Sequence, residues 1–115
     1  MKLTNSKIKY LIAIHKLAAK NEKVRSTDIA NELGVSRPSV NRMINSLSSK
    51  KLLHKEPYGP VHFTTLGEEL VQYYVHQYEK ITQYFKNSLM FSSEDAERCA
   101  VLLLSEMSER NSILN

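Results

Sequence analysis

The side chains with the clearest chemistry lie in the segment 36–45, which reads SRPSVNRMIN. An arginine fork can hydrogen-bond guanine, an asparagine can read adenine or bind a phosphate, and a proline ring can contact a thymine methyl group. If the segment is helical, one polar face carries Pro38, Ser39, Asn41, Arg42 and Asn45. These groups recognise DNA bases and do not transform a substrate, so the segment predicts a surface that reads the DNA major groove.

Two helices joined by a tight turn are expected to position this surface. Ser26 or Thr27 would cap the first helix, and Gly34 would supply a turn that tolerates positive φ. Ser36 would cap the second helix, with Pro38 in its first turn, where the missing N–H costs nothing. The apolar stripe of this second helix would be Val40, Met43, Ile44 and Leu47.

A short hairpin is expected after these helices. Two strands, over 54–56 and 61–63, would flank a tip with the sequence Pro57-Tyr58-Gly59-Pro60. His54 and His62 would then lie roughly across from each other, as an exposed pair or, less commonly, as two ligands of a metal ion. Two helices followed by a hairpin predict a winged helix-turn-helix, whose usual ligand is double-stranded DNA.

Positive charge is concentrated in the first half of the chain. Residues 1–65 contain 12 Lys/Arg and 4 Asp/Glu, a net charge of +8, whereas residues 66–115 contain 4 and 8, a net charge of −4. Polyanion binding is therefore expected in the first half, while lysines on the first helix fit a solvated surface equally well. Phosphate contacts are expected from Arg25, Arg37, Arg42, Lys50, Lys51 and Lys55.

Helical periodicity also predicts three supporting helices. The first covers about 6–20, the second runs from 65 to about 87, and the third follows residue 92. Thr65 and Glu68 have the spacing of a capping box at the start of the long helix. Ser92 or Ser93 would cap the last helix.

The last helix is apolar on almost every side, so it needs a surface to pack against. We expect that surface to be the same helix pair in a second copy, giving a two-fold homodimer. The residues expected at the dimer contact are Val101, Leu102, Leu103, Leu104 and Met107.

Together these patterns predict a mainly α fold, with a winged helix-turn-helix DNA-binding domain over 1–65 and a helical dimerisation region over 66–115. No apolar run approaches the ~20 residues that span a bilayer, and MKLTNSKIKY carries no export signal. The single cysteine, Cys99, excludes an internal disulfide framework, so we expect a cytoplasmic protein without a membrane partner. No catalytic triad, Gly-rich phosphate loop or spaced carboxylate pair predicts an enzyme.

The residues from Tyr10 to about Arg110 resemble the metal-dependent repressors of the diphtheria toxin repressor and manganese-transport repressor type. The specific parts are VRSTDIANELGVSRPSVNRMINSL and the hairpin KEPYGPVHF. The resemblance implies a homodimeric repressor or regulator that binds a palindromic operator. It also implies DNA contacts by Thr27, Ser36, Arg37, Pro38, Ser39, Asn41 and Arg42.

The metal site of that family is not carried over to this chain. By the resemblance, the ligand positions fall on Lys9, Ile12, Tyr78 and the pair Val101-Leu102, or Leu102-Leu103 in a register shifted by one. None of these side chains ligates Fe²⁺ or Mn²⁺ usefully. We therefore expect no metal and no other cofactor, with an apolar core formed by Ile12, Val101 and Leu102. The alternative is a site rebuilt around His76, Glu79 and Cys99.

Two classes of function follow from the sequence. The first is a metal-independent, sequence-specific regulator of transcription that binds double-stranded DNA. The second is a protein-interaction adaptor, in which the winged helix no longer binds DNA and the long helices bind a partner. A salt-dependent DNA shift would favour the first class, because phosphate contacts release counterions.

Overall fold

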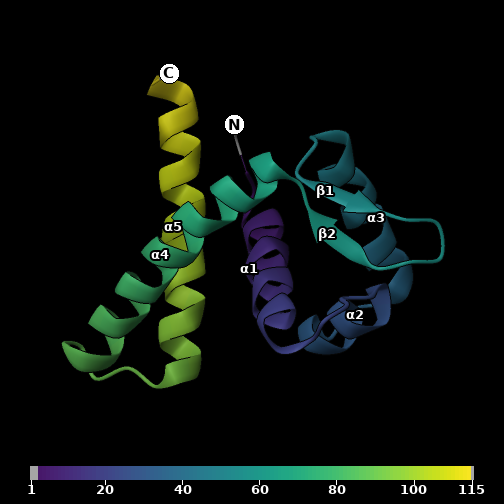
Figure 1. Ribbon diagram of the computed structural model, residues 1–115. Helices are drawn as coiled ribbons and strands as arrows, with labels where there is room; N and C mark the ends of the chain where they lie inside the picture. Colours follow the sequence, from purple (N-terminus) through teal and green to yellow (C-terminus); the bar gives the residue numbers. More distant parts are fainter. Residues whose placement is uncertain (1–2, 115) are drawn as a thin grey trace. The chain divides into compact units, whose positions relative to one another are not determined.

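The computed structural model describes residues 3–114, and side chains for residues 3–107. Residues 1–2 and 115, at the outer ends of the two predicted domains, lie outside the described residues. In chain order the elements are α1 (Asn5–Lys20), α2 (Ser26–Leu33), α3 (Arg37–Ser49), β1 (Leu53–Lys55), β2 (Val61–Phe63), α4 (Thr65–Asn87) and α5 (Ser93–Leu114) (Figure 1). The predicted mainly α architecture with a winged helix-turn-helix is confirmed.

The chain divides into two compact units. One unit, called the winged unit below, contains residues 10–71. The other, called the helical unit, contains residues 1–9 and 72–115. Helices α1 and α4 contribute to both units. The predicted domain boundary between residues 65 and 66 stays a prediction.

The core of the winged unit is built from the apolar faces of its helices and strands. Helix α3 contacts both α2 and β1. Three of the four residues in its predicted stripe are fully buried, and the fourth, Met43, is half-buried. The buried side chains contributed by these elements and their connections include Ile29, Ala30, Val40, Ile44, Leu47, Leu52, Leu53 and Val61. Burial of each large aliphatic side chain stabilises the fold by about 1.5–3 kcal/mol before entropy is deducted.

Hydrogen bonds at the helix ends locate the caps. Helix α2 is preceded by Arg25, whose backbone N–H donates to Asp28 Oδ2 at 2.9 Å, so the predicted cap at Ser26 or Thr27 is one or two residues late. Gly34 ends α2 with a φ of 67°, as predicted. The predicted cap of α3 is also confirmed, because Ser36 Oγ accepts from the backbone N–H of Ser39 at 3.2 Å.

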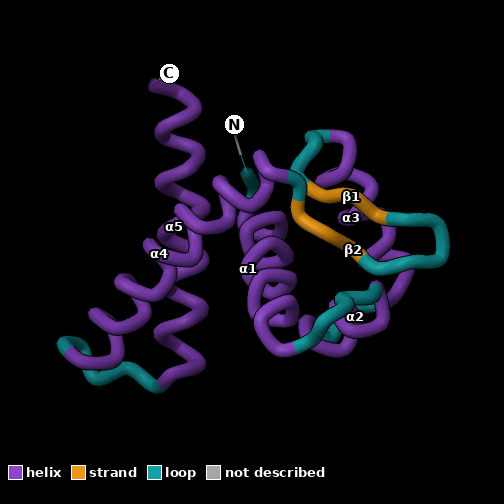
Figure 2. Tube along the Cα trace, in the orientation of Figure 1, coloured by secondary structure: helices purple, strands orange, loops and turns teal. Residues whose placement is uncertain are grey.

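The wing is an antiparallel hairpin of β1 and β2 (Figure 2). His54 pairs with His62, so the predicted opposition of the two histidines is confirmed, and both are exposed. The first strand begins at Leu53, one residue before its predicted start. On the other side of β2, the N–H of Val61 donates to the carbonyl of Val24 at 2.8 Å. The sequence did not predict this third short pairing, which joins the start of α2 to the wing.

Helix α4 begins against the base of the wing. Thr64 Oγ1 accepts from the N–H of Gly67 at 3.0 Å and donates to the carbonyl of Lys51 at 2.6 Å. Thr64 therefore caps the helix, one residue earlier than the predicted box of Thr65 and Glu68. A Cβ at Gly67 would overlap the backbone carbonyl of Leu52, so only glycine permits this close approach.

In the helical unit, α4 and α5 are connected by residues 88–92 (Figure 1). The predicted cap at Ser92 is confirmed, because its hydroxyl accepts from the N–H of Asp95 at 3.1 Å. Side chains buried in this unit include Leu3, Ile8, Tyr74, Tyr78, Ala96, Ala100, Val101 and Leu104. Over the described residues, no helix combines the length and the apolar character needed to cross a membrane.

Two expectations about α5 need adjustment. Ile12 and Val101 are buried, but Leu102 is 60% exposed and so is not part of the expected apolar core within this chain. Of the five residues expected at the dimer contact, Val101 and Leu104 are buried within the chain itself. The exposed apolar groups on α5 are Leu102, Leu103 and Met107.

Candidate nucleic-acid interface

The outward face of α3 carries the residues expected to read DNA. Because Val40, Ile44 and Leu47 point into the core, helical geometry places the intervening polar residues on the opposite side. Ser39 is half-buried on the edge of this face. The exposed members are Arg37, Pro38, Asn41, Arg42 and Asn45. The structure therefore brings the five predicted base-reading residues together along the first two and a half turns of one helix.

A short hydrogen-bond chain orders the guanidinium group on this face. Ser36 Oγ donates to Ser39 Oγ at 2.9 Å, and Arg42 Nη2 donates to the same Ser39 oxygen at 3.2 Å. A guanidinium carries five N–H donors in a fixed plane, so most of its donors stay available to a ligand. Holding the arginine before binding lowers the entropy lost when it meets a base. Residue types alone did not indicate this contact, although the S-x-x-S-x-x-R spacing is its signal.

Two further predicted contacts flank α3. Thr27 is exposed in the first turn of α2, and Ser36 is exposed at the start of α3. The expected phosphate-binding cations are also accessible: Arg25, Arg37, Arg42 and Lys51 are exposed, and Lys50 and Lys55 are half-buried. All of them belong to the winged unit. In the sequence they lie before, within and after α3, and their charges are accessible to a polyanion.

The wing tip is tied to the start of α2. Arg25 Nη1 donates to the carbonyl of Tyr58 at 3.4 Å, across 33 positions of sequence. The tip itself closes through the N–H of Gly59, which donates to the carbonyl of Glu56 at 2.9 Å. At the base of the tip, Lys55 Nζ lies 3.5 Å from the carbonyl oxygen of Glu56. Arg25 is exposed and one of its guanidinium nitrogens is bonded to the wing, while the phosphate contact expected of it stays a prediction.

Comparison with known proteins identifies the family. A family model described as iron dependent repressor, N-terminal DNA binding domain, matches residues 2–61, which is more than half of the chain. The chain belongs to this family. The resemblance seen in the sequence is confirmed, and so is the prediction that the chain is not an enzyme, because the matched proteins are repressors and regulators. No curated protein matches the chain.

Solved structures agree with this membership. The manganese regulator SloR is 25% identical over 90% of this chain and 47% of its own, with a TM-score of 0.73. The manganese-activated repressor ScaR, in its apo form, is 25% identical over 93% of this chain and 53% of its own, with a TM-score of 0.65. IdeR of T. acidophilum shares the fold, with a TM-score of 0.75 at 20% identity, over 96% of this chain and 53% of its own. The chain thus spans about half the length of these relatives.

The family description implies a metal ion, but the donor groups of this chain do not fit one. At the positions assigned to ligands, Ile12 and Val101 are buried aliphatic residues, Lys9 is an exposed cation, and Tyr78 is a buried phenol. None of these is a ligand that Fe²⁺ or Mn²⁺ prefers. Within residues 3–107, no group of three or more His, Cys, Asp or Glu side chains is arranged to hold a metal. The alternative site around His76, Glu79 and Cys99 is therefore not formed in the described part of the chain.

Proposed function

We propose that this chain is a sequence-specific regulator of transcription that binds double-stranded DNA, most simply as a repressor. The observation that carries the proposal is the exposed polar face of α3, on which Ser39 orders Arg42. In this fold class the N-terminal half of the second helix enters the major groove. The family description supports the same ligand, since the matched model is a DNA-binding domain.

Base reading is assigned to the middle of that face. Arg42 can offer two N–H donors to guanine O6 and N7, and Asn41 can pair with adenine or bind a phosphate. The ring of Pro38 can contact a thymine methyl group. The polar face also includes Arg37, Ser39 and Asn45. Contacts with the DNA backbone beside this face are assigned to Thr27 and Ser36.

Phosphate binding is assigned to the accessible cations of the winged unit. Residues 1–65 carry a net charge of +8, so each phosphate contact releases condensed counterions and the affinity falls as salt rises. Lys55, on the wing, supplies such a contact without reading sequence. This division separates residues that position the protein from residues that specify the site.

The regulator is further proposed to work without a divalent metal ion. Ligands shift a conformational equilibrium only by their differential affinity for the two states. Aliphatic, lysine and tyrosine side chains at the family's ligand positions give a divalent ion no such affinity. If these positions form packed apolar surface, the DNA-competent arrangement is populated without a metal, and control comes from the protein level, a protein partner or another ligand.

We also propose that the regulator is a homodimer on a palindromic operator in the cytoplasm. The support is the apolar surface that α5 leaves exposed at Leu102, Leu103 and Met107. A two-fold dimer would bury this surface against its own copy. Two reading helices would then address half-sites whose centres lie about one helical turn, roughly 34–36 Å, apart.

Selection of bound sequences from random duplexes tests this proposal. The full chain is incubated with the duplex pool at two salt concentrations, with and without a strong chelator. The expected result is a palindromic motif whose affinity falls with salt and does not change with chelator. Absence of any bound duplex at low salt would favour the adaptor function, and loss of the motif in chelator would show that a metal is required.

A further inference from the structure

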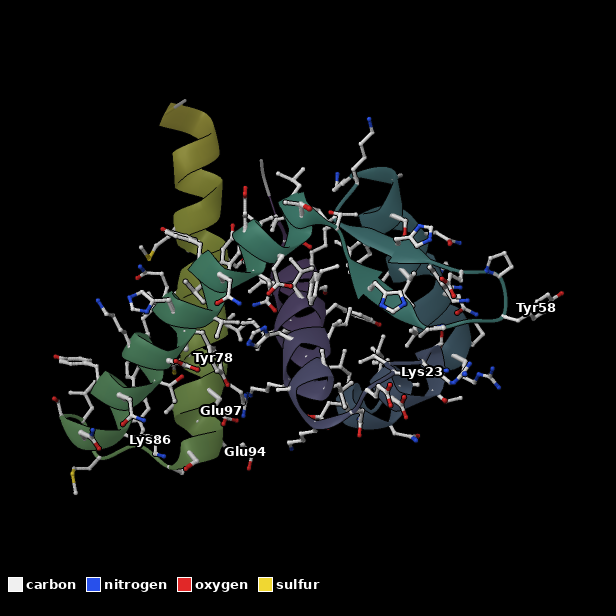
Figure 3. All side chains as sticks on the ribbon, in the orientation of Figure 1. Lys23, Tyr58, Tyr78, Lys86, Glu94 and Glu97 are labelled. Atoms are coloured by element: carbon white, nitrogen blue, oxygen red, sulfur yellow. The ribbon has the colours of Figure 1, made fainter. Side chains whose placement is uncertain are left out.

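The tip of the wing presents an aromatic side chain with nothing around it. Tyr58 is 100% exposed, and Figure 3 shows its side chain extending away from the hairpin. Its φ of 56° lies in the left-handed region, which is strained for a residue with a Cβ. A strained, fully solvated tyrosine does not stabilise the hairpin. Its full exposure leaves both the ring and the hydroxyl accessible to another molecule.

The position of this tyrosine is fixed from α2. Arg25 Nη1 donates to the Tyr58 carbonyl at 3.4 Å, while the neighbouring residue, Val24, accepts from the N–H of Val61 at 2.8 Å. The segment 24–25 thus holds the wing at its tip and at the first residue of β2, directly after the tip. The backbone N–H of Arg25 is bonded to Asp28, so the anchor is itself part of the start of α2. A link of this kind couples the tip to the reading unit.

The chemistry of the tip restricts what it can contact. Residues 56–59 read Glu-Pro-Tyr-Gly, so they bring a carboxylate and no cation. Charge alone would therefore not attract this tip to a phosphate. The phenolic O–H is a neutral hydrogen-bond donor, and tyrosine is among the side chains that bind DNA phosphate and sugar oxygens.

We propose that Tyr58 contacts DNA by donating its phenolic hydrogen bond to the sugar-phosphate backbone beside the groove that α3 reads. Arg25 is then a positioning residue, which holds the tip through the Tyr58 carbonyl and does not itself contact phosphate. This inference rests on the proposed DNA-binding function and changes the role that the sequence suggested for Arg25. It predicts a contribution to affinity that is independent of sequence and of charge.

Two substitutions at the tip test the contact. Affinities of the full chain are measured for the selected operator and for a scrambled duplex of equal length, over a series of salt concentrations. Tyr58→Phe removes only the hydroxyl, and Tyr58→Gly removes the side chain at a φ that glycine adopts freely. Both are expected to weaken binding about five- to tenfold on both duplexes, the usual effect of one lost hydrogen bond.

The salt dependence separates this contact from an ionic one. Neither tyrosine variant should change the slope of log K against log salt, whereas Lys55→Ala should reduce that slope by about one. Because Gly relieves the left-handed strain, Tyr58→Gly should not lower the thermal unfolding midpoint, which excludes misfolding as the cause of weaker binding. Wild-type affinity in Tyr58→Phe would overturn the hydroxyl contact.

A double-mutant cycle tests the positioning role. Arg25→Met keeps the backbone N–H that binds Asp28 and an unbranched apolar stem. It should weaken binding without changing the salt slope, and it should cost nothing further in the Tyr58→Gly background. An additive loss, or a slope reduced by about one, would make Arg25 a phosphate contact and overturn the proposal. Failure of the unsubstituted chain to bind any duplex would instead remove the proposed function itself.

Discussion

The winged unit and the helical unit treat their apolar residues differently. In the winged unit, the large apolar side chains left exposed, among those described, are Val35, Tyr58 and Leu66. In the helical unit the corresponding exposed residues are Tyr73, Tyr84, Leu89, Met90, Phe91, Leu102, Leu103 and Met107. Exposed apolar side chains mark an interaction site where they form a contiguous patch, and the helical unit has more of them with which to form one. The winged unit therefore buries most of its large apolar side chains, whereas the helical unit leaves more of its own exposed.

If the winged unit is held by its own contacts, its most sensitive position should be Gly67. A Cβ there would overlap the backbone carbonyl of Leu52, and a backbone atom cannot move aside as a side chain can. Gly67→Ala is therefore expected to lower the free energy of unfolding by about 3 kcal/mol or more. Chemical denaturation at two protein concentrations measures this loss, which should not depend on concentration.

Gly34→Ala is the matched control for that substitution. Its added methyl group meets nothing within 4 Å, so the cost comes only from the φ of 67°. We expect a loss of about 1–2 kcal/mol. Equal losses at the two glycines would show that the contact between α4 and the base of the wing is not tight.

Two leucines on α5 test whether the exposed apolar residues of the helical unit bind a second copy of the chain. Leu104 is 2% exposed and Leu103 is 42% exposed, although they are adjacent in sequence. Leu104→Ala should lower the free energy of unfolding by about 2–5 kcal/mol because it leaves a cavity. Leu103→Asp should chiefly weaken self-association, since a carboxylate in an apolar contact loses its hydration without gaining a partner.

Sedimentation velocity and thermal unfolding, each over a range of protein concentrations, distinguish these effects. For the unsubstituted chain we expect a dimer at micromolar concentration and a midpoint that rises with concentration. Leu103→Asp should abolish that concentration dependence, whereas Leu104→Ala should preserve it and shift the midpoint down. A stable monomer in the unsubstituted chain would mean that the exposed surface of the helical unit binds something other than a second copy.

Most of the fold could be predicted because it follows from local periodicity. The helical spacing of Val40, Met43, Ile44 and Leu47, and the turn residues Gly34 and Ser36, define the reading unit without reference to the rest of the chain. The caps of α2 and α4 were misplaced by one or two residues. Adjacent polar residues, such as Thr64 and Thr65, can each cap a helix, and only the hydrogen-bond geometry decides between them.

The candidate site could also be predicted only in part. Its polar face could be predicted, since which side of α3 points outward follows from the apolar stripe. The bond between Arg25 and Tyr58 could not, because it joins residues 33 positions apart and depends on how the wing folds back on α2. The inward and outward residues of α5 could not be predicted either, since a helix that is apolar almost all round has no periodic signal.

Substitutions on the DNA-binding surface should change binding and leave the free energy of unfolding unchanged. Arg42→Ala should weaken binding to the selected operator by about 1–3 kcal/mol and much less to a scrambled duplex. Lys55→Ala should weaken both duplexes alike, because phosphate contacts carry no sequence information. Competition binding with both duplexes measures the two effects. Equal losses on both duplexes for Arg42→Ala would remove its assignment as a base-reading residue.

The smallest expected effects come from one buried hydroxyl group in each unit. Thr82 Oγ1 on α4 and Ser48 Oγ on α3 are buried, and neither has a hydrogen-bond partner in the described part of the chain. Burying a hydroxyl without a partner costs free energy, and valine replaces threonine with nearly the same shape. Thr82→Val is therefore expected to raise the free energy of unfolding by up to about 1 kcal/mol. Ser48→Ala should raise it by a similar or smaller amount, because alanine is also the better helix former. Both changes are measured by chemical denaturation at a fixed protein concentration.

The result that would contradict this expectation is a destabilised Thr82→Val beside a stabilised Ser48→Ala. The Thr82 hydroxyl would then have a hydrogen-bond partner in solution. The molecule that binds the helical unit would in that case form polar as well as apolar contacts with it.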